Sequence, residues 1–276
     1  MRRLIVTADD FGLAESVNEA VEIAARDGVL TAASLMVGAA AARDAVARAR
    51  RLPQLRVGLH LVLVNGQPLL PPSSLPALVG ADGWFLSDLG QAGIRCFFLP
   101  GARRQIEAEV RAQFQAFAAT GLPLDHVNAH CHFHLHPTVL GVILKVGREF
   151  GLRAVRLPRE PRLTGFGALA LSPWLALLRA RLRRAGVLCN DYVLGLGETG
   201  AMTEATVLRL LENTGAVGWD DVGEMYFHPA TRRTPDLIRA MPGYDHEGEL
   251  RALTSPKVRA ALDRLGLRRV AFSDLG

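Results

Sequence analysis

The sequence of 276 residues has few cysteines, and it lacks both a cysteine pattern and a long hydrophobic run. Cys96, Cys131 and Cys189 are widely spaced, which excludes a disulfide framework and a cysteine-based zinc site. No apolar run is long enough to span a bilayer, and a secretory signal would overlap residues 4–8, whose composition is typical of a core strand. We therefore expect a cytoplasmic protein.

Acidic residues are also in deficit, since 32 Lys and Arg stand against 27 Asp and Glu and give a net charge of +5. A basic surface favours acidic partners such as nucleic acid or anionic lipid. No recognition-helix, RNP or zinc-finger signature accompanies the charge, so we do not expect a nucleic-acid partner. The hydrophobic fraction of 49% indicates a globular chain with a large core.

Short runs rich in Val, Leu and Ile alternate with stretches of helical periodicity. Strands are predicted at residues 4–8, 31–37, 56–63, 126–130, 154–157, 222–227 and 268–272. Helices are predicted at residues 15–26, 103–119, 137–150, 204–213 and 256–265. A further helix, rich in Ala and Arg, is predicted between the strand at 31–37 and Arg51. Apolar strands alternating with helices indicate an α/β fold with a parallel sheet of about seven strands. We predict a distorted, incomplete (β/α) barrel.

The length is compatible with a single domain over residues 1–276, as in other α/β barrels. Two segments interrupt the alternation of strands and helices, at about residues 65–100 and 158–190. Both are expected to form excursions over one rim of the barrel.

Metal-binding residue types follow or end several predicted strands. They are Asp9 and Asp10, His60, His130 and His228. Because the carboxyl ends of parallel strands converge on one rim, these side chains are expected to meet there. Adjacent carboxylates repel each other, and a divalent cation relieves that cost. One carboxylate could then bind the metal while the other serves as a base for water. Taken singly, an Asp can also cap a helix and a lone His can be a core residue, so each residue leaves both interpretations open.

His130, His132, His134 and His136 alternate with other residue types. In an extended chain all four imidazoles would lie on one side. The run could form a surface metal trap, or a loop whose first histidine reaches the mouth of the barrel. An Asp with two neutral imidazoles and open positions is a catalytic arrangement for zinc or a similar ion.

A basic amphipathic helix is expected from Ser172 to Arg184, with Ser172 as its cap and Pro173 in the first helical position. Its apolar stripe is formed by Trp174, Leu175, Leu178 and Leu182, and its opposite face by Arg179 and Arg183. Such a helix can lie in a lipid interface, where Trp174, Leu178 and Arg179 would make contact. Packing over the barrel is the alternative.

Four segments together resemble the YdjC-like carbohydrate deacetylases, which are related in chemistry to the NodB-like polysaccharide deacetylases. They are TADDFG at 7–12, GLHL at 58–61 with GQPL at 66–69, HCHFHLHP at 130–137, and Glu224 with HPA at 228–230. Each segment is a modest signal, and the four in register cover almost the whole chain. The resemblance implies a distorted (β/α) barrel of the NodB-like superfamily.

The same resemblance implies one divalent metal ion, zinc or magnesium, held by Asp10, His60 and His130. Asp9 matches the base of the family, and His228 stands where a general acid or a group on the oxyanion side is expected. The residues expected to contact the substrate are Arg156, Glu224, His132 and His134. A surface salt bridge is the alternative role for Arg156.

The sequence departs from the family pattern before and after its motifs. Asn128 and Ala129 replace the usual Asp and Ser, and Val64 replaces a common Thr. These departures affect the groups that orient the metal-binding imidazoles.

Residues 30–38 and 59–63 are most similar to the hopanoid-biosynthesis-associated subgroup, which implies N-acetylglucosaminyl hopanoid as substrate, with peripheral contact at the inner membrane. A homodimer is also compatible with the sequence. Deacetylation of soluble chito-oligosaccharides, a metal phosphoesterase and a non-enzymatic histidine-rich metal buffer are the alternatives.

Overall fold

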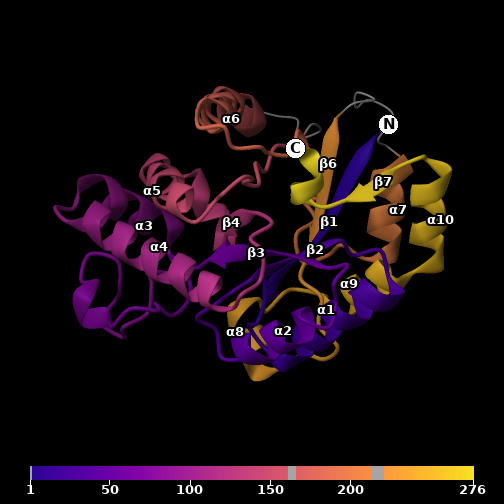
Figure 1. The fold of residues 1–276 in the computed structure, drawn as a ribbon, viewed down its shortest axis with the longest axis horizontal. Helices are drawn as coiled ribbons and strands as arrows, with labels where there is room; N and C mark the ends of the chain where they lie inside the picture. Colours follow the sequence, from indigo (N-terminus) through magenta and orange to yellow (C-terminus); the bar gives the residue numbers. More distant parts are fainter. Residues whose placement is uncertain (1, 161–165, 213–220) are drawn as a thin grey trace.

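The computed structural model describes residues 2–160, 166–212 and 221–276. Its strands are β1 (Arg3–Phe11), β2 (Ala32–Leu35), β3 (Arg56–Leu61), β4 (Val127–Ala129), β5 (Tyr192–Leu194), β6 (Val222–Phe227) and β7 (Arg268–Val270). They form one parallel sheet in the order β4-β3-β2-β1-β6-β5, with β7 also paired to β1. Beyond β4, single parallel bridges join Val127 to Val155 and Ala154 to Leu188. The curled sheet confirms the predicted incomplete barrel (Figure 1).

Helices cover the outside of the sheet (Figure 1). They are α1 (Glu15–Asp27), α2 (Ala42–Ala49), α3 (Leu89–Phe98), α4 (Ala102–Ala119), α5 (Pro137–Glu149), α6 (Phe166–Arg184), α7 (Glu204–Glu212), α8 (Pro235–Ala240), α9 (His246–Thr254) and α10 (Pro256–Arg264). Short 3₁₀ segments are η1 (Pro72–Ser74), η2 (His130–Leu135) and η4 (Phe272–Leu275). Proline begins α5, α8 and α10 because the first helical N–H needs no partner there.

The secondary structure departs from the sequence predictions in several places. Residues 154–157 do not form a regular strand, because only Ala154 and Val155 pair with neighbours. The three-residue β5 was not predicted, and neither was α3 within the Pro- and Gly-rich excursion. Helix α6 begins at Phe166, so that Pro173 lies inside the helix instead of starting it.

The inside of the barrel changes from apolar to polar along the strands. At the amino ends of the strands a small apolar cluster fills it, made of Ile5, Ala32, Ala154, Val222, Val270 and Phe272. Further along, the alternation of the strands places polar side chains on the same inner face. Those that are buried there include Thr7, Asp9, Ser34, His60, His126, Asn128, Arg156 and Glu224. Buried polar groups are costly unless they are paired. The polar half of the interior, towards the carboxyl ends of the strands, is therefore a candidate functional region.

Gly58 makes room for one member of this interior. A Cβ atom on Gly58 would lie 2.5 Å from the ring of His126. The ring also stacks on Phe272 at a centroid distance of 4.6 Å, which closes the apolar end of the barrel. The glycine of the GLHL segment is therefore required by packing, two residues before His60.

Candidate metal and catalytic site

Asp9 and Asp10 lie at the carboxyl end of β1, where the strand is irregular. The pairing register with β2 shifts between Ala8 and Phe11, and Asp10 has a φ of +59°. A left-handed residue at a bulge re-aims its side chain, and Asp tolerates this conformation better than most residues. The irregularity lets the two adjacent carboxylates enter different groups of side chains.

One group consists of Asp10, His60 and His130. The Nε2 atom of His60 and the Nδ1 atom of His130 each lie 3.2 Å from Oδ1 of Asp10. One ligand atom from each residue lies within 4.8 Å of the others, and all three residues are buried. The second oxygen of Asp10, Oδ2, is buried with no hydrogen-bond partner. A carboxylate and two imidazoles with an unpaired oxygen fit a divalent cation, as expected from the sequence.

Asn128 orients one of these potential ligands, His60. Its Oδ1 lies 2.6 Å from Nδ1 of His60, and since an amide oxygen only accepts, that ring nitrogen donates. The Nε2 atom of His60 is thereby left as the acceptor that faces Asp10. The amide Nδ2 of Asn128 donates to Asp9 and to Ser34, each at 3.0 Å. The residue that departs from the family pattern thus links the metal-binding group to Asp9.

A buried chain of hydrogen bonds fixes the orientation of Asn128. The hydroxyl of Ser34 lies 3.0 Å from Nε2 of His126, whose Nδ1 lies 2.8 Å from Asp125. These residues are 0–4% exposed. Because Ser34 is held from behind, a flip of the amide would break several contacts at once.

The other group consists of Asp9, Arg156 and Glu224. Arg156 donates from Nη1 to Oδ2 of Asp9 at 2.5 Å and from Nη2 to Oδ1 at 3.1 Å. It also donates from Nε to Oε1 of Glu224 at 2.9 Å, and Thr7 donates to the same oxygen. Burial alone would raise the pKa of Asp9, but the charge of Arg156, with further contributions from His60 and His228, holds it well below its usual range. Asp9 is therefore ionised.

Arg156 and Glu224 lie deeper than the sequence indicated. Both side chains are 0% exposed, so the alternative of a surface salt bridge for Arg156 is wrong. Arg156 pairs with both Asp9 and Glu224, and neither Arg156 nor Glu224 lies at the surface. In the structure Arg156 supports Asp9 directly, and Glu224 does so through Arg156.

His228 follows β6 at the same mouth. It is 9% exposed, and its Nδ1 atom has no hydrogen-bond partner. Burial lowers the pKa of His228 from 6.5 to about 4, so the imidazole is neutral near pH 7. Its ring lies between those of Tyr226 and Tyr244, at centroid distances of 5.6 Å and 5.0 Å.

Tyr226 is a site residue that the sequence analysis missed. The guanidinium of Arg156 lies 4.8 Å from its ring centroid, and its hydroxyl bonds to Thr199. Glu224, Tyr226 and His228 alternate along β6 and share its inner face. That period of two was the signal that could have identified Tyr226.

The histidine run forms a turn and not an extended segment, and its first histidine lies at the barrel mouth. Residues 130–135 form the 3₁₀ segment η2, in which Cys131 and His132 have φ values of +52° and +53°. The turn sends the imidazoles in different directions, so only His130 joins the metal-binding group.

The later histidines have separate partners. The Nε2 atom of His132 lies 3.4 Å from the hydroxyl of Tyr226. His134 is 1% exposed and its Nε2 donates to the backbone oxygen of Arg156 at 2.9 Å. His136 packs against Phe97 outside the barrel mouth, at a ring-centroid distance of 4.2 Å.

A pocket of about 560 Å³ adjoins the metal-binding group. Its lining comes from the 65–100 excursion, the loops after β1, β2 and β3, helices α4 and α8, and His130. The lining residues include Leu13, Met36, Val62, Asn65, Gln67, Trp84, Gln113, His130, Asp236 and Arg239. Arg239 lies over the Trp84 ring at 4.8 Å from the centroid, so the excursion and α8 meet at the pocket. Aromatic, amide and acidic groups suit a carbohydrate ligand.

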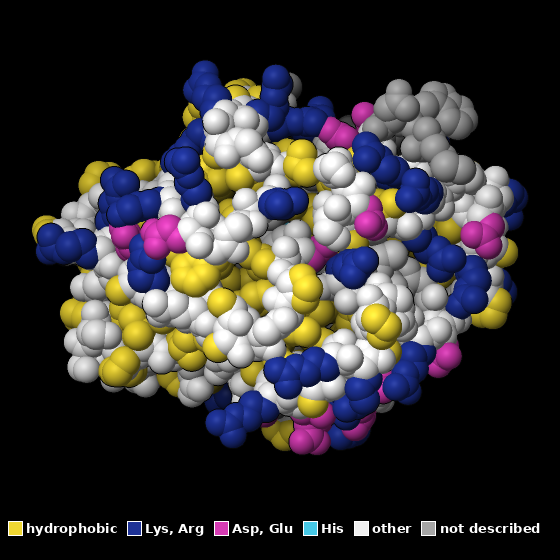
Figure 2. All heavy atoms as spheres, in the orientation of Figure 1, with side chains coloured by type: hydrophobic (Ala, Val, Ile, Leu, Met, Phe, Trp, Pro, Cys, Tyr) yellow, Lys and Arg dark blue, Asp and Glu magenta, His cyan; other side chains and the backbone are white. Residues whose placement is uncertain are grey.

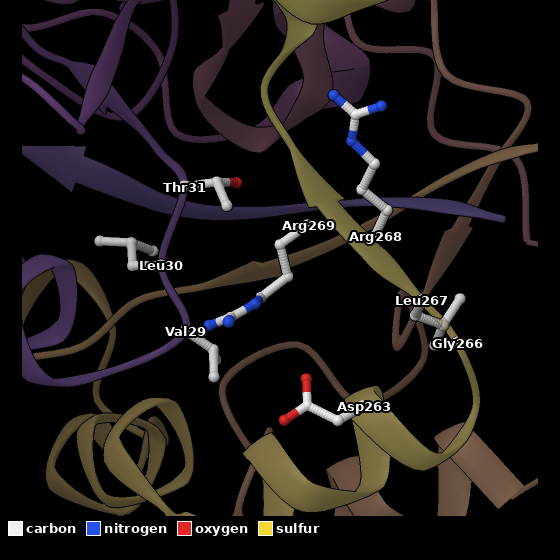
Figure 3. Close-up of a pocket in the computed structure, with 8 residues that line it drawn as sticks. All are labelled: Val29, Leu30, Thr31, Asp263, Gly266, Leu267, Arg268 and Arg269. Atoms are coloured by element: carbon white, nitrogen blue, oxygen red, sulfur yellow. The ribbon is translucent and has the colours of Figure 1, made fainter. Parts of the chain in front are cut away.

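A second pocket of about 570 Å³ lies at the amino ends of β2 and β7, away from these groups. In Figure 3 the charged side chains of Asp263, Arg268 and Arg269 point in different directions. Because they do not converge on one point, this pocket is not a candidate catalytic site.

The helix predicted to contact lipid, α6, packs one face against the protein. Leu178 is 1% exposed, so it is not available to a lipid surface, and the lipid contact expected for this side chain is wrong. Arg179 pairs with Asp191, and Trp174 is half-buried against the core. Among the described residues, no helix combines the length and the apolar character needed to cross a bilayer.

Comparisons with known proteins identify the family. A model described as YdjC-like protein matches residues 3–264. The chain belongs to the YdjC-like family. A carbohydrate deacetylase of Geobacillus stearothermophilus is 40% identical over 99% of this chain and 98% of its own length. A chitooligosaccharide deacetylase of Serratia marcescens is 30% identical over 99% of this chain and 98% of its own length.

A solved structure has a similar fold over the whole chain. It is a protein of Enterococcus faecalis V583 named for cellobiose-phosphate cleavage, with a TM-score of 0.82 and 25% identity, covering 100% of this chain and 99% of the other. The barrel and its excursions therefore share one architecture with that protein over the full length.

Proposed function

We propose that this chain is a metal-dependent carbohydrate deacetylase, which hydrolyses the N-acetyl group of a substrate containing N-acetylglucosamine. The observation that supports this most is the buried Asp10–His60–His130 group beside the ionised Asp9. The names of the related deacetylases point to the same reaction.

A divalent cation held by Asp10, His60 and His130 would polarise the acetamide carbonyl and lower the pKa of a water molecule. Asp9 would take the proton of that water, because Arg156 keeps this carboxylate charged. The same ion pair makes Asp9 a weak base, so we expect substrate binding to loosen one of its contacts with Arg156.

His228 would supply a proton to the leaving amine nitrogen. It is neutral in the free protein, so it must first receive the proton that the attacking water loses. Its unpaired Nδ1 provides an acceptor for this transfer. Proton transfer from water to amine then balances the hydrolysis, which leaves acetate and a free amino sugar.

The substrate is the open part of the proposal. The resemblance in residues 30–38 and 59–63 favours N-acetylglucosaminyl hopanoid, whereas the name of the Serratia relative favours a chito-oligosaccharide. The chemistry at the acetyl group is the same for both, so the catalytic residues do not discriminate between them. The pocket beside His130 holds both apolar side chains, such as Met36, and polar ones, such as Gln67.

Acetate release tests the proposal. Purified protein would be incubated with N-acetylglucosaminyl hopanoid in detergent and, separately, with diacetylchitobiose, before and after treatment with a chelator. We expect release from at least one substrate, its loss with chelator and its recovery when zinc or magnesium is returned. Activity unaffected by the chelator, or no acetate from either substrate, would contradict the proposal.

The two alternatives other than deacetylation gain no supporting observation. A metal phosphoesterase would need an additional metal, but residues 2–160, 166–212 and 221–276 hold a single group of potential ligands. A histidine-rich buffer would need several imidazoles around its ions, whereas His132, His134 and His136 have separate partners. Assays for phosphate release and for metal stoichiometry above one test these two functions.

A further inference from the structure

Helix α3 leaves its large apolar side chains in solvent. The exposed set on and just after the helix is Leu89, Ile94, Phe97, Phe98 and Leu99. Phe98 is 78% exposed and Ile94 is 62% exposed, whereas the buried residues of this helix are the small Ala92 and Cys96. An ordinary surface helix buries its large apolar residues. A cluster of exposed ones marks an interaction surface.

A cationic groove of about 380 Å³ adjoins this cluster. It runs between the end of α3, the starts of α4 and α5, and the side chain of Arg181 from α6. Arg103 and Arg181 line it, and no carboxylate does. Arg181 is held across α5 by donating to the backbone oxygen of Pro137. Gly141 allows this approach, since a Cβ there would lie 2.8 Å from the guanidinium.

The surrounding charge has one sign. Residues 89–104 contain three Arg and residues 171–184 contain four, with no Asp or Glu in either segment. Two carboxylates of neighbouring segments are already paired, Glu107 with Lys145 and Asp191 with Arg179. Lys and Arg side chains gather over the corner of the molecule that α6 occupies (Figures 1 and 2). An apolar surface with a cationic border is complementary to an anionic lipid interface.

We propose that α3, together with the arginines of α6, docks the protein on an anionic lipid surface. The apolar side chains of α3 enter the interface, and Arg103, Arg104 and the exposed arginines of α6 meet the phosphate groups. A second copy of the chain fits this surface less well. A two-fold contact would place the same cationic segments against each other.

The docking surface adjoins the site but does not depend on the proposed function. Phe97 packs against His136, which lies six residues after the metal-binding His130. The attachment would therefore hold the segment that contains His130 near the lipid. This arrangement suits a lipid-linked substrate, although lipid binding can be measured without any substrate.

The test is co-sedimentation of the full chain with vesicles of phosphatidylcholine alone and of phosphatidylcholine mixed with phosphatidylglycerol. We expect stronger partition to the anionic vesicles, and at least about a tenfold loss of partition in the Ile94→Ser/Phe98→Ser double variant. The Arg103→Gln/Arg104→Gln variant should lose the preference for anionic lipid. The matched controls are Ile23→Ser/Leu188→Ser and Arg43→Gln/Arg56→Gln, which change exposed residues elsewhere and should bind like the unaltered protein.

Three results would overturn the proposal. They are no partition to anionic vesicles, equal loss in the α3 variant and its control, or a dimer in solution that the Ile94→Ser/Phe98→Ser variant converts to a monomer. The last would show that a second copy covers α3. An unchanged melting temperature checks that the variants fold. Because sedimentation needs no turnover, a failure of the deacetylase proposal would leave this result unaffected.

Discussion

The two adjacent carboxylates at the barrel mouth, Asp9 and Asp10, differ in how completely their oxygens are paired. On one side both oxygens of Asp9 accept from Arg156, and Oδ1 also accepts from Asn128. On the other side Oδ2 of Asp10 is buried without a partner, although Asp10 is the next residue in the chain. An unpaired buried carboxylate oxygen is costly, so it indicates a place for a cation. Pairing by arginine instead indicates a carboxylate held ionised by the protein itself.

The largest expected effect is on the unpaired side. Replacing His60 by Ala should remove a ligand, so that metal content falls to background and acetate release falls by at least about a thousandfold. Metal content would be measured by mass spectrometry on the purified protein. His136→Gln is the matched control, since His136 packs against Phe97 and lies outside the metal-binding group. Full metal content in His60→Ala would place the cation elsewhere.

On the paired side, Asp9→Asn should separate catalysis from metal binding. We expect metal content to be retained while acetate release falls by about a hundredfold to ten-thousandfold, because the amide cannot take a proton from water. Arg156 loses part of its compensating charge in this variant, so the melting temperature must be measured beside the rate. Full activity with a normal melting temperature would remove Asp9 from the role of base.

The importance of the arginine for stability can be measured with Arg156→Gln. This change leaves Asp9 and Glu224 buried without their cation, so the free energy of unfolding should fall by about 3–5 kcal/mol. Urea denaturation would measure it. Arg111→Gln removes an exposed pair with Glu149 and should have little effect. Equal losses in both variants would show that the buried pairing has no special contribution.

Acid should affect stability through His228. The folded protein holds the pKa of His228 at about 4, below its ordinary value of 6.5, so the unfolded chain binds this proton at higher pH. The contribution of His228 is thus complete above pH 6.5 and is lost as the pH falls towards 4, by about 3 kcal/mol in total. Between pH 7 and pH 4.5, His228→Gln should lose less free energy of unfolding than the unaltered protein. Parallel losses would contradict the lowered pKa.

The sequence predicted the part of this site that depends on strand ends. Apolar strands followed by Asp9, Asp10, His60 and His130 were enough to place those residues on one rim, because parallel strands share a direction. The barrel and six of its seven strands were predicted for the same reason. The exception, β5, has three residues and too short a pattern to detect.

What the sequence did not predict depends on local backbone geometry and on pairing inside the barrel. The positive φ values at Cys131 and His132 turn the imidazoles of the histidine run in different directions, and the sequence pattern there did not predict them. The burial of Arg156 follows from its pairing with Asp9 and Glu224, which lie 147 and 68 residues away in the sequence. The exposed face of α3 was missed because its segment resembled a loop.

The smallest expected effects concern Asn128, the residue that joins the two sides. Asn128→Ala removes the acceptor of His60 Nδ1 and the donor to Asp9, so metal affinity should fall by about 10- to 100-fold. Asn128→Asp keeps an acceptor for His60 but places a second carboxylate beside Asp9. Metal affinity should then stay within a few-fold of that of the unaltered protein while acetate release falls. Calorimetric titration with zinc, run beside the rate assay, distinguishes the two variants. If both bind zinc as the unaltered protein does, His60 is oriented without Asn128, and the two sides of the mouth are independent.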